Sequence, residues 1–449
     1  MISEARADRL VFPIADSFVA RLHELSKDTP GFEFLRTFQY SSDSRIEALY
    51  GARGTDRLEK LQYDVDSPRM LHVPGADNGF VQVQISTWAS EIKKEPNRVK
   101  KLNEDATLVV PLGYGRLLAV VFDGASSQKS IEGLEKYGMR GSWYISHLAS
   151  LEFPNSEAFD RLQDNPKATA EDVMIILNRW LREKLEKIEG VDYNDRLAIP
   201  GMAATIAVID YGTRKVSIAH AADTLGIAEF DNGYRVLTDD KNARWDEETQ
   251  VLIDSIVAEA LLEGRVVKPV EAKRDERVRD QLKQSFKTKI NTPIGTGILN
   301  GQDELVTNGL IHTSSINIPA DSGLKLHLAT DGIHSIWTAR EDLKDNPDLQ
   351  MRKLLGALNT HTYNPGNPIT RVTDRLDQDR GGYLFRRGMD DATRVSIVVT
   401  QGEEDSPFSE ENEELLRNDR DEITRYLAGV DERVRIALTQ YELQASSQS

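Results

Sequence analysis

Acidic side chains recur at the ends of apolar segments that the sequence predicts to be β-strands. Asp123-Gly124 ends the run "LLAVVFDG", and Asp331-Gly332 follows "LKLHLAT" in the same way. Asp-Gly is also a common turn dipeptide, so one such junction indicates only that a strand ends there. A carboxylate buried alone is costly or takes up a proton, so it usually has a partner cation or a hydrogen-bonding turn. The repetition of the pattern favours a shared cation.

Further acidic residues lie beside other predicted strands. "LNEDATLVV" and "GMDDATRVSIVV" each place an acidic pair before a strand, and "KVSIAHAAD" ends in an aspartate. Strand ends can bring distant carboxylates to one rim of a sheet, where they suit hard divalent cations such as Mg²⁺ or Mn²⁺. Two such cations about 3.5–4 Å apart activate a water and stabilise an in-line displacement at phosphorus. The positions that fit this scheme are Glu104, Asp105, Asp123, Asp223, Asp331, Asp390 and Asp391.

The composition excludes several other chemistries. The chain has 449 residues and no cysteine, which rules out disulfides, thiolate zinc sites and cysteine nucleophiles. Its formal net charge is −17, and it has no basic stripe of the kind that binds nucleic acid. It also lacks a Walker A sequence, a secretory signal, and an apolar run of the ~20 residues that a membrane span needs. We therefore expect a cytoplasmic protein that binds neither nucleic acid nor membranes.

Apolar runs predict the elements that position these residues. "GFVQVQIS" alternates as a half-buried strand does, and "TLVV", "LLAVVFDG", "ATIAVIDY", "KVSIAHAAD", "LKLHLATDG" and "RVSIVVT" predict further strands. Residues 169–188 have a helical apolar stripe that opens with a Thr169/Asp172 capping-box pattern. A second helical region covers 246–264 and continues, after a break at Pro269, to about Lys289. Strands in short consecutive pairs with long helices between them favour an α+β fold over strict βαβ alternation.

The composition changes after residue 400. "QGEEDSPFSEENEE" is an acidic linker, and a helix with an apolar stripe follows it between residues 423 and 441. Such a stripe packs on the protein's own body or pairs with a partner or a second copy, since its spacings also suit a coiled coil. We divide the chain into an N-terminal extension of unknown function (1–77), a catalytic domain (78–402), and the linker with its C-terminal amphipathic helix (403–449).

The ordered motifs resemble the metal-dependent Ser/Thr protein phosphatases of type 2C, the PPM family. "NEDA", "VVFDGASS", the central region from "PGMAATIAVIDY" to "VLTDD", "LKLHLATDGIHSIW" and "DDAT" follow one another in the family's order between about residues 79 and 400. The resemblance, to a divergent bacterial-like member, implies an α+β fold: a four-layer α-β-β-α sandwich with metals in a cleft between the ends of two central sheets. It also implies two divalent metal ions, Mn²⁺ or Mg²⁺, and a phosphoprotein substrate.

The resemblance assigns roles to the principal acidic residues. Asp123 would bridge the two metals. Glu104 and the carbonyl of Gly124 would bind one of them. Asp331 and Asp390 would bind the other. Asp123, Asp331 and Asp390 are therefore the predicted catalytic residues.

The remaining acidic residues have secondary roles in this assignment. Asp105 would orient bound water, and Asp223 would hold a weaker third metal. Asp391 is the alternative to its neighbour as the terminal ligand, although the first residue of "DDAT" aligns better with the family's "DN". Ser335 stands where the family has a second acid after "DG", which weakens the case for the third metal.

Other departures from the family concern the substrate phosphate. Ala125 replaces a histidine that often follows "DG" and is a candidate proton donor to the leaving alcohol. Lys100, with Arg98 close by, stands where the family has an arginine that holds phosphate; a lysine supplies charge without a bidentate fork. His334 is a candidate acid, but we favour its interpretation as a surface histidine at a strand end.

Functions of different classes fit these observations. One is an active Mg²⁺/Mn²⁺-dependent phosphatase acting on phosphoserine or phosphothreonine. Another is a catalytically weak, phosphatase-like scaffold that binds a partner through residues 1–77 or the C-terminal helix. Retention of Glu104, Asp123, Asp331 and Asp390 favours the enzyme, because a degenerate relative would more readily have lost a ligand. Other metal-dependent phosphohydrolases are a third alternative.

Overall fold

The chain forms two compact units, each with a hydrophobic core of its own. The computed structural model describes residues 64–65, 69–73, 80–88, 104–125, 129–135, 140–231, 233–319, 323–338, 345–359 and 391–399. The first unit comprises Met1–Lys241, Phe286–Asp331 and Asp391–Asp405, and the second comprises Asn242–Ser285, Gly332–Asp390 and Ser406–Ser449.

The first unit contains two antiparallel β-sheets. One has the strand order β10-β7-β6-β5-β4, and the other has the order β1-β3-β12-β11-β8-β9 with β2 also paired to β3. The strands of the former are β4 (Ala106–Gly113), β5 (Arg116–Ala125), β6 (Gly201–Asp210), β7 (Lys215–Ala221) and β10 (His312–Asn317). The strands of the latter are β1 (Asp64–Val65), β2 (Arg69–His72), β3 (Phe80–Trp88), β8 (Leu225–Phe230), β9 (Gly233–Val236), β11 (Leu324–Ala329) and β12 (Ala392–Val398).

The two sheets pack face to face through an apolar core. Leu117 and Val121 of β5 belong to this core together with alternate residues of β3, β11 and β12. Because successive side chains of a strand point to opposite faces, Leu118 and Val120 belong instead to a second core, which the sheet shares with helices. The strand β5 is therefore buried on both faces, which explains its almost continuous run of apolar residues.

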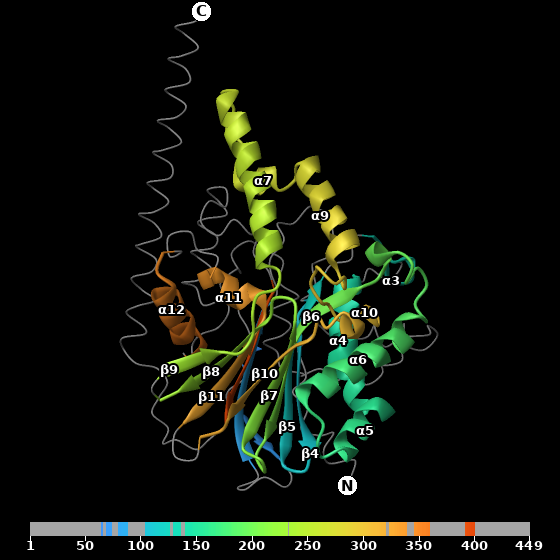
Figure 1. The fold of residues 1–449 in the computed structure, drawn as a ribbon, viewed down its shortest axis with the longest axis vertical. Coiled ribbons are helices and arrows are strands. Elements are labelled where there is room, and N and C mark those ends of the chain that lie inside the picture. Colours follow the sequence, from blue (N-terminus) through green and yellow to red (C-terminus); the bar gives the residue numbers. More distant parts are fainter. Residues whose placement is uncertain are drawn as a thin grey trace, which may run out of the picture. The chain divides into compact units, whose positions relative to one another are not determined.

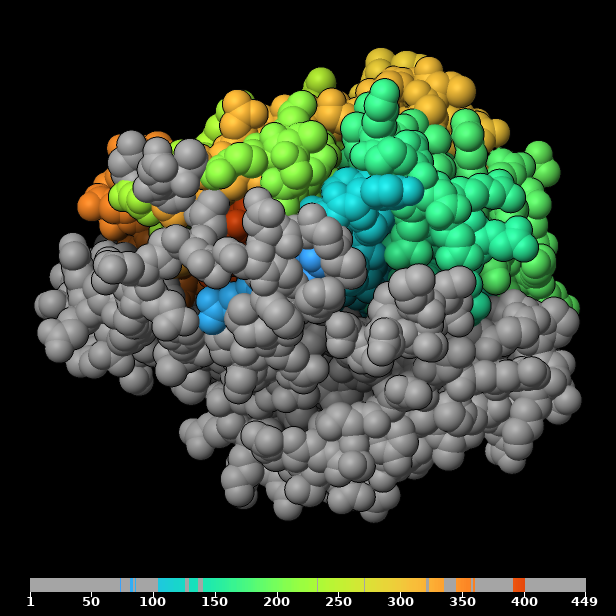
Figure 2. Space-filling view, turned by 90° about the horizontal axis from the view of Figure 1, so that it is seen from below, coloured from blue at the N-terminus to red at the C-terminus, as the bar shows by residue number. Residues whose placement is uncertain are grey.

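The sheet with the order β10-β7-β6-β5-β4, called the β4–β7 sheet below, is covered by helices on its other face (Figure 1). They are α4 (Gly141–Leu151), α5 (Glu157–Asp164) and α6 (Ala170–Leu185). The predicted capping box of α6 is present: the N–H of Asp172 donates to Thr169 Oγ1, and the N–H of Thr169 donates to Asp172 Oδ2 at 2.8 Å. In the space-filling view, the part of the first unit that runs from residue 104 towards residue 230 is seen as cyan and green atoms that lie next to one another (Figure 2).

Shorter helical segments connect the main elements of the first unit. These are α3 (Glu132–Glu135), the 3₁₀ turns Phe153–Asn155 and Arg196–Ala198, and α10 (Glu304–Thr307). The predicted α+β class with two packed sheets is confirmed. Apolar patterning located β3 to β7, β11 and β12, whereas β9 and β10 escaped it because most of their residues are polar or exposed. The strands β1 and β2 hydrogen-bond to β3, so the sheet extends into residues 64–72, and the division at residue 77 stays a prediction.

The described part of the second unit is helical. It contains α7 (Ala243–Leu262), α8 (Pro269–Ala272), most of α9 (Glu276–Lys289), most of α11 (Asp331–Thr338) and α12 (Pro347–Asn359). Ile253, Ile256, Ala272 and Val278 form a small core. The predicted helical region and its break before α8 are confirmed. The predicted C-terminal helix lies outside the described residues, and its association with a partner or a second copy stays a prediction. None of the described helices is long and apolar enough to cross a membrane.

A buried histidine in α4 makes the folded state sensitive to acid. His147 is 4% exposed, its ring stacks on Trp143 with centroids 4.6 Å apart, and its Nδ1 lies 3.0 Å from the carbonyl oxygen of Trp143. Burial lowers the pKa of His147 to about 4, although the hydrogen bond to Trp143 opposes the shift. The folded protein therefore keeps this ring neutral at pH values where the unfolded chain already binds a proton.

We expect the free energy of unfolding to fall as the pH drops from about 6.5 towards 4. The neutral His147 ring contributes fully to the free energy of unfolding above the pKa that histidine has in the unfolded chain. Below that pKa, this contribution is lost at ~1.4 kcal/mol per pH unit within the window. Urea titrations at several pH values measure this slope. His147→Gln removes the titrating ring and should flatten the dependence; an identical slope in the variant would contradict this account.

Candidate functional site

Segments that are distant in the sequence meet at one end of the two sheets. The N–H of Glu104 donates to Asp391 Oδ2 at 2.6 Å, which joins residues 287 positions apart. The hydroxyl of Thr330 donates to Asp105 Oδ2 at 2.7 Å, which joins residues 225 positions apart. The side chains of Glu104, Asp105 and Asp391 are buried. The "NEDA" segment before β4 thus contacts the end of β11 and the start of β12, which belong to the other sheet.

Thr330 links β11 to β12 as well as to Asp105. Its N–H donates to the carbonyl of Thr393 at 2.9 Å, and the N–H of Thr393 donates back to Thr330 Oγ1 at 2.9 Å. Both threonines are completely buried. The next residue, Asp331, is half-buried and begins α11. The hydroxyl therefore fixes the position of the Asp105 carboxylate relative to the strand end from which Asp331 starts.

Glu104 lies directly beside the Asp123-Gly124 end of β5. The hydroxyl of Ser146 donates to the Glu104 carbonyl oxygen at 2.6 Å, which ties this residue to α4. A Cβ built on Gly124 would lie 2.7 Å from that carbonyl oxygen and 2.7 Å from the carbonyl oxygen of Ser142. Only glycine allows this approach of three backbones. Asp123, which is half-buried, pairs with Ala203 of β6 at the same level.

The Glu104 side chain pairs with a cation. Arg140 Nη1 lies 3.1 Å from Glu104 Oε1, and the side chains are 56% and 7% exposed, respectively. Arg140 directly precedes α4. A buried carboxylate requires a partner of this kind. Sequence reasoning missed Arg140 and Ser146 because nothing in their local pattern indicates a contact with residues near position 104.

Asp223 lies at the same end of the β4–β7 sheet. Ala221 pairs with Ala204 of β6, next to the pair formed by Ala203 and Asp123, and Asp223 follows two residues later. The residue between them, Ala222, has a left-handed φ of 71°, which is strained for a residue other than glycine. No pattern in the sequence indicated this strain.

A buried histidine lies close to Asp223. The Nε2 of His220 is 2.6 Å from the carbonyl oxygen of Asp239. Burial lowers the pKa of His220 to about 4, and the Asp223 carboxylate opposes this shift by attraction. The Thr224 hydroxyl, next to Asp223, lies 2.8 Å from that of Thr205. These contacts hold the backbone on both sides of Asp223 in place.

Some predicted positions are not described or differ from expectation. Arg98, Lys100 and Asp390 lie outside the described residues. Ala125 is the last residue of β5 and is half-buried, while Ser335 lies within α11. His334, interpreted as a surface histidine at a strand end, is instead 5% exposed and belongs to α11. The interpretation was wrong because the strand ends before Thr330 and the helix begins at once.

The acidic residues suit a divalent cation by their chemistry. In the part of the chain that the structure describes, no three or more His, Asp or Glu side chains lie close enough together to hold a metal ion. The expected ligand Asp390 falls outside that part. Glu104, Asp123, Asp331 and the Gly124 carbonyl offer only oxygen atoms, which Mg²⁺ and Mn²⁺ prefer. The guanidinium of Arg140 lies beside Glu104, so the environment of this carboxylate suits a positively charged ligand.

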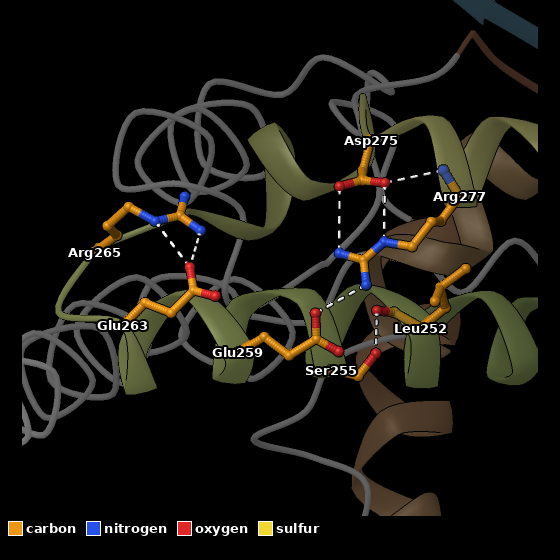
Figure 3. Close-up of polar contacts among 7 residues, drawn as sticks. All are labelled: Leu252, Ser255, Glu259, Glu263, Arg265, Asp275 and Arg277. Atoms are coloured by element: carbon orange, nitrogen blue, oxygen red, sulfur yellow. Dashed lines mark hydrogen bonds and ion pairs between the residues drawn. The ribbon is translucent and has the colours of Figure 1, made fainter.

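The second unit has a cavity of about 430 Å³ that is lined by residues of α7, α8, α9 and their connections. Its charged side chains pair with one another (Figure 3). Arg277 Nη1 donates to Glu259 Oε2 at 2.8 Å, and Arg277 Nε donates to Asp275 Oδ1 at 3.2 Å. Arg265 pairs with Glu263. The cavity contains none of the predicted site residues among those that line it.

We expect Thr330→Val to destabilise the protein by about 1–3 kcal/mol. The variant keeps the shape of the side chain but removes a donor to Asp105 and an acceptor for the N–H of Thr393, and both groups are buried. Urea unfolding with circular dichroism measures the loss. Thr330→Ser retains the hydroxyl and is the matched control, which should lose less. Equal losses in the two variants would show that the hydroxyl does not hold this junction together.

Comparisons with known proteins agree with the motif order. A family model described as protein phosphatase 2C matches residues 95–366. A search of curated proteins found no match.

Similar solved structures include phosphatases from two bacteria. The serine/threonine phosphatase PstP/Ppp of Mycobacterium tuberculosis is 15% identical, with coverage of 72% of this chain and 100% of that chain and a TM-score of 0.36. Serine/threonine phosphatase Stp1 from Staphylococcus aureus is 14% identical, with coverage of 75% and 100% and a TM-score of 0.37. RsbX in complex with magnesium is 12% identical, with coverage of 75% and 98% and a TM-score of 0.32. The family model, residues 95–366, spans more than half of the sequence, and the chain belongs to the protein phosphatase 2C family.

Proposed function

We propose that this protein hydrolyses phosphoserine and phosphothreonine in proteins, with two divalent metal ions, Mn²⁺ or Mg²⁺, as cofactors. The observation that carries the proposal is the direct hydrogen bonding of the Glu104-Asp105 segment to Thr330 and Asp391, beside Gly124. Membership of the protein phosphatase 2C family supports the reaction class. The all-oxygen donor set supports the choice of metal.

Hydrogen bonds hold the segment that carries Glu104 in place without any cation. Ions held there would activate the attacking water and neutralise charge on the phosphoryl oxygens. The backbone of Glu104 is fixed at both polar atoms, its N–H by Asp391 and its carbonyl oxygen by Ser146. Preorganisation of this kind lowers the reorganisation needed during the reaction. We assign Glu104, Asp123, the Gly124 carbonyl, Asp331 and Asp390 as metal ligands.

The contacts of Asp391 and Asp105 favour secondary roles for both residues, in place of direct metal binding. Asp391 accepts the hydrogen bond from the Glu104 N–H and is 2% exposed, which favours its neighbour Asp390 as the terminal ligand. We assign to Asp105, which accepts the hydrogen bond of Thr330, the role of holding water. Asp223, at the same end of the sheet, is the proposed ligand of a weaker third ion.

The proposed substrate is a phosphorylated serine or threonine side chain of another protein. Lys100 and Arg98 would attract its phosphate. Because Ala125 has no proton to donate, the leaving alkoxide would take its proton from water or from another side chain.

The assay that tests this function uses the purified full chain and a phosphothreonine peptide. We expect release of inorganic phosphate with added Mn²⁺, its loss in excess chelator, and its recovery when Mn²⁺ is restored. Full activity in the presence of chelator would contradict the metal-dependent mechanism. Absence of hydrolysis across metals and phosphopeptides would favour a phosphatase-like scaffold instead.

A further inference from the structure

The first turn of α4 adjoins the candidate site through several independent contacts. The carbonyl oxygen of Ser142 lies 2.7 Å from the point where a Cβ on Gly124 would stand. One turn later, Ser146 donates to the carbonyl oxygen of Glu104. Arg140, at the N-cap, reaches the Glu104 side chain. The start of this 11-residue helix is therefore fixed against the ends of β4 and β5 where the acidic residues lie.

The ion pair between Arg140 and Glu104 is unequal. Glu104 is almost fully enclosed, whereas more than half of the Arg140 side chain is open to solvent. Within the described residues, Nη1 of Arg140 is the only atom of the guanidinium that donates a hydrogen bond. Arginine carries five N–H donors in a planar fork that matches two oxygens of a phosphate. Arg140 thus has donors to offer an anion that approaches from solvent.

The helix terminus has unused donors as well. The N-cap residue of α4 provides no side-chain hydrogen bond to the first turn. The hydroxyl of Ser142, in that turn, is fully buried and has no hydrogen-bond partner in the described structure. The N–H groups at a helix start lack partners within the helix and favour anions. A buried hydroxyl without a partner is costly, so it indicates a ligand that the site is built to receive.

We propose that Arg140 and the first turn of α4 bind the phosphoryl group of the substrate. This inference rests on the proposed function and adds a subsite to it. In the structure the guanidinium pairs with Glu104. A divalent cation at that carboxylate would leave the guanidinium available to bind the phosphate dianion. Arg140 thus supplies the bidentate fork that a lysine at position 100 does not offer.

The first test measures inorganic phosphate binding to the Mn²⁺-loaded full chain by calorimetry, together with phosphate inhibition of phosphopeptide hydrolysis. We expect Arg140→Gln to lower the affinity for inorganic phosphate roughly 10- to 100-fold, the effect of a lost charge-assisted pair. The same variant should raise KM more than it lowers kcat. The phosphate affinity of Arg140→Lys should lie between that of Arg140→Gln and that of the wild type, because lysine keeps the charge but lacks the planar fork of donors. Arg161→Gln, which removes an exposed pair with Glu157 on α5, is the matched control and should bind phosphate as the wild type does.

A second variant and a second readout make the test independent of folding and activity. Ser142→Ala should weaken phosphate binding roughly 10- to 100-fold, the value of one hydrogen bond to a charged group. Arg140→Gln should also bind Mn²⁺ more tightly than the wild type, because a competing cation is gone. Unchanged phosphate affinity in both variants, or a wild type that binds no phosphate, overturns this inference even if hydrolysis is normal. If the wild type binds phosphate but hydrolyses nothing, and the variants bind phosphate more weakly, the result supports the phosphate subsite and refutes only the proposed hydrolysis.

Discussion

Asp123→Asn is expected to lower kcat for a phosphothreonine peptide by about a thousandfold or more, which corresponds to ~4 kcal/mol of transition-state stabilisation. The substitution keeps the size of the side chain and removes the charge of the proposed bridging ligand. Asp123 is half-buried near the end of β5, where its backbone pairs with Ala203, so the strand should be unaffected. Steady-state kinetics at saturating Mn²⁺ measures the loss.

The fold of this variant is checked by its circular dichroism spectrum and its midpoint of urea unfolding, which should match those of the wild type or exceed them. Removing one negative charge from the proposed metal site should relieve repulsion among its carboxylates when no cation is bound. Asp164→Asn, at the exposed end of α5, is the matched control and should keep full activity. Wild-type turnover in Asp123→Asn would refute the assignment of this residue.

Gly124→Ala is expected to destabilise the protein by about 1–3 kcal/mol and to abolish hydrolysis at the same time. The added methyl group would lie 2.7 Å from the carbonyl oxygens of Glu104 and Ser142 and 2.9 Å from the carbonyl carbon of Ser142. These are backbone atoms of a β-strand start and a helix, which cannot move aside cheaply. The segment bearing Glu104 must therefore shift away from Asp123, which separates the proposed ligands.

Gly212→Ala provides the matched control for this substitution. Gly212 lies in the exposed turn between β6 and β7, and a Cβ there would meet only the end of the Asp210 side chain at 3.3 Å. The free energy of unfolding of the Gly212→Ala variant should differ from that of the wild type by no more than about 0.5 kcal/mol. Urea unfolding and phosphopeptide kinetics on both variants give the comparison. A fully active, equally stable Gly124→Ala variant would show that the close approach of these segments does not shape the site.

Local patterns in the sequence predicted the elements that depend on neighbours in the chain. The capping box at Thr169 and Asp172 and the buried stripe of α6 formed as expected, because both arise within one or two helical turns. The runs that became β5 and β6 were recognisable because both faces of these strands are buried. The acidic residues at strand ends were also recognisable, because each lies just before or just after an apolar run.

The contacts that complete the site were not predictable in this way. Arg140, Ser146 and Thr330 act on residues that lie tens to hundreds of positions away, and nothing in their own segments indicates the partner. The left-handed backbone of Ala222 was equally hidden, because alanine does not signal such a conformation as glycine does. The order of the motifs indicated the family, but the contacts of Arg140, Ser146 and Thr330 with the proposed site are seen only in the folded structure.

Calorimetric titration of Mn²⁺ into the full chain tests most directly whether these carboxylates form one cation site. The wild type is expected to bind Mn²⁺ in the absence of substrate. Asp123→Asn and Asp331→Asn should each weaken this binding strongly, while Asp164→Asn should bind as the wild type does. Wild-type Mn²⁺ affinity in both site variants, or no binding by the wild type, would contradict the account.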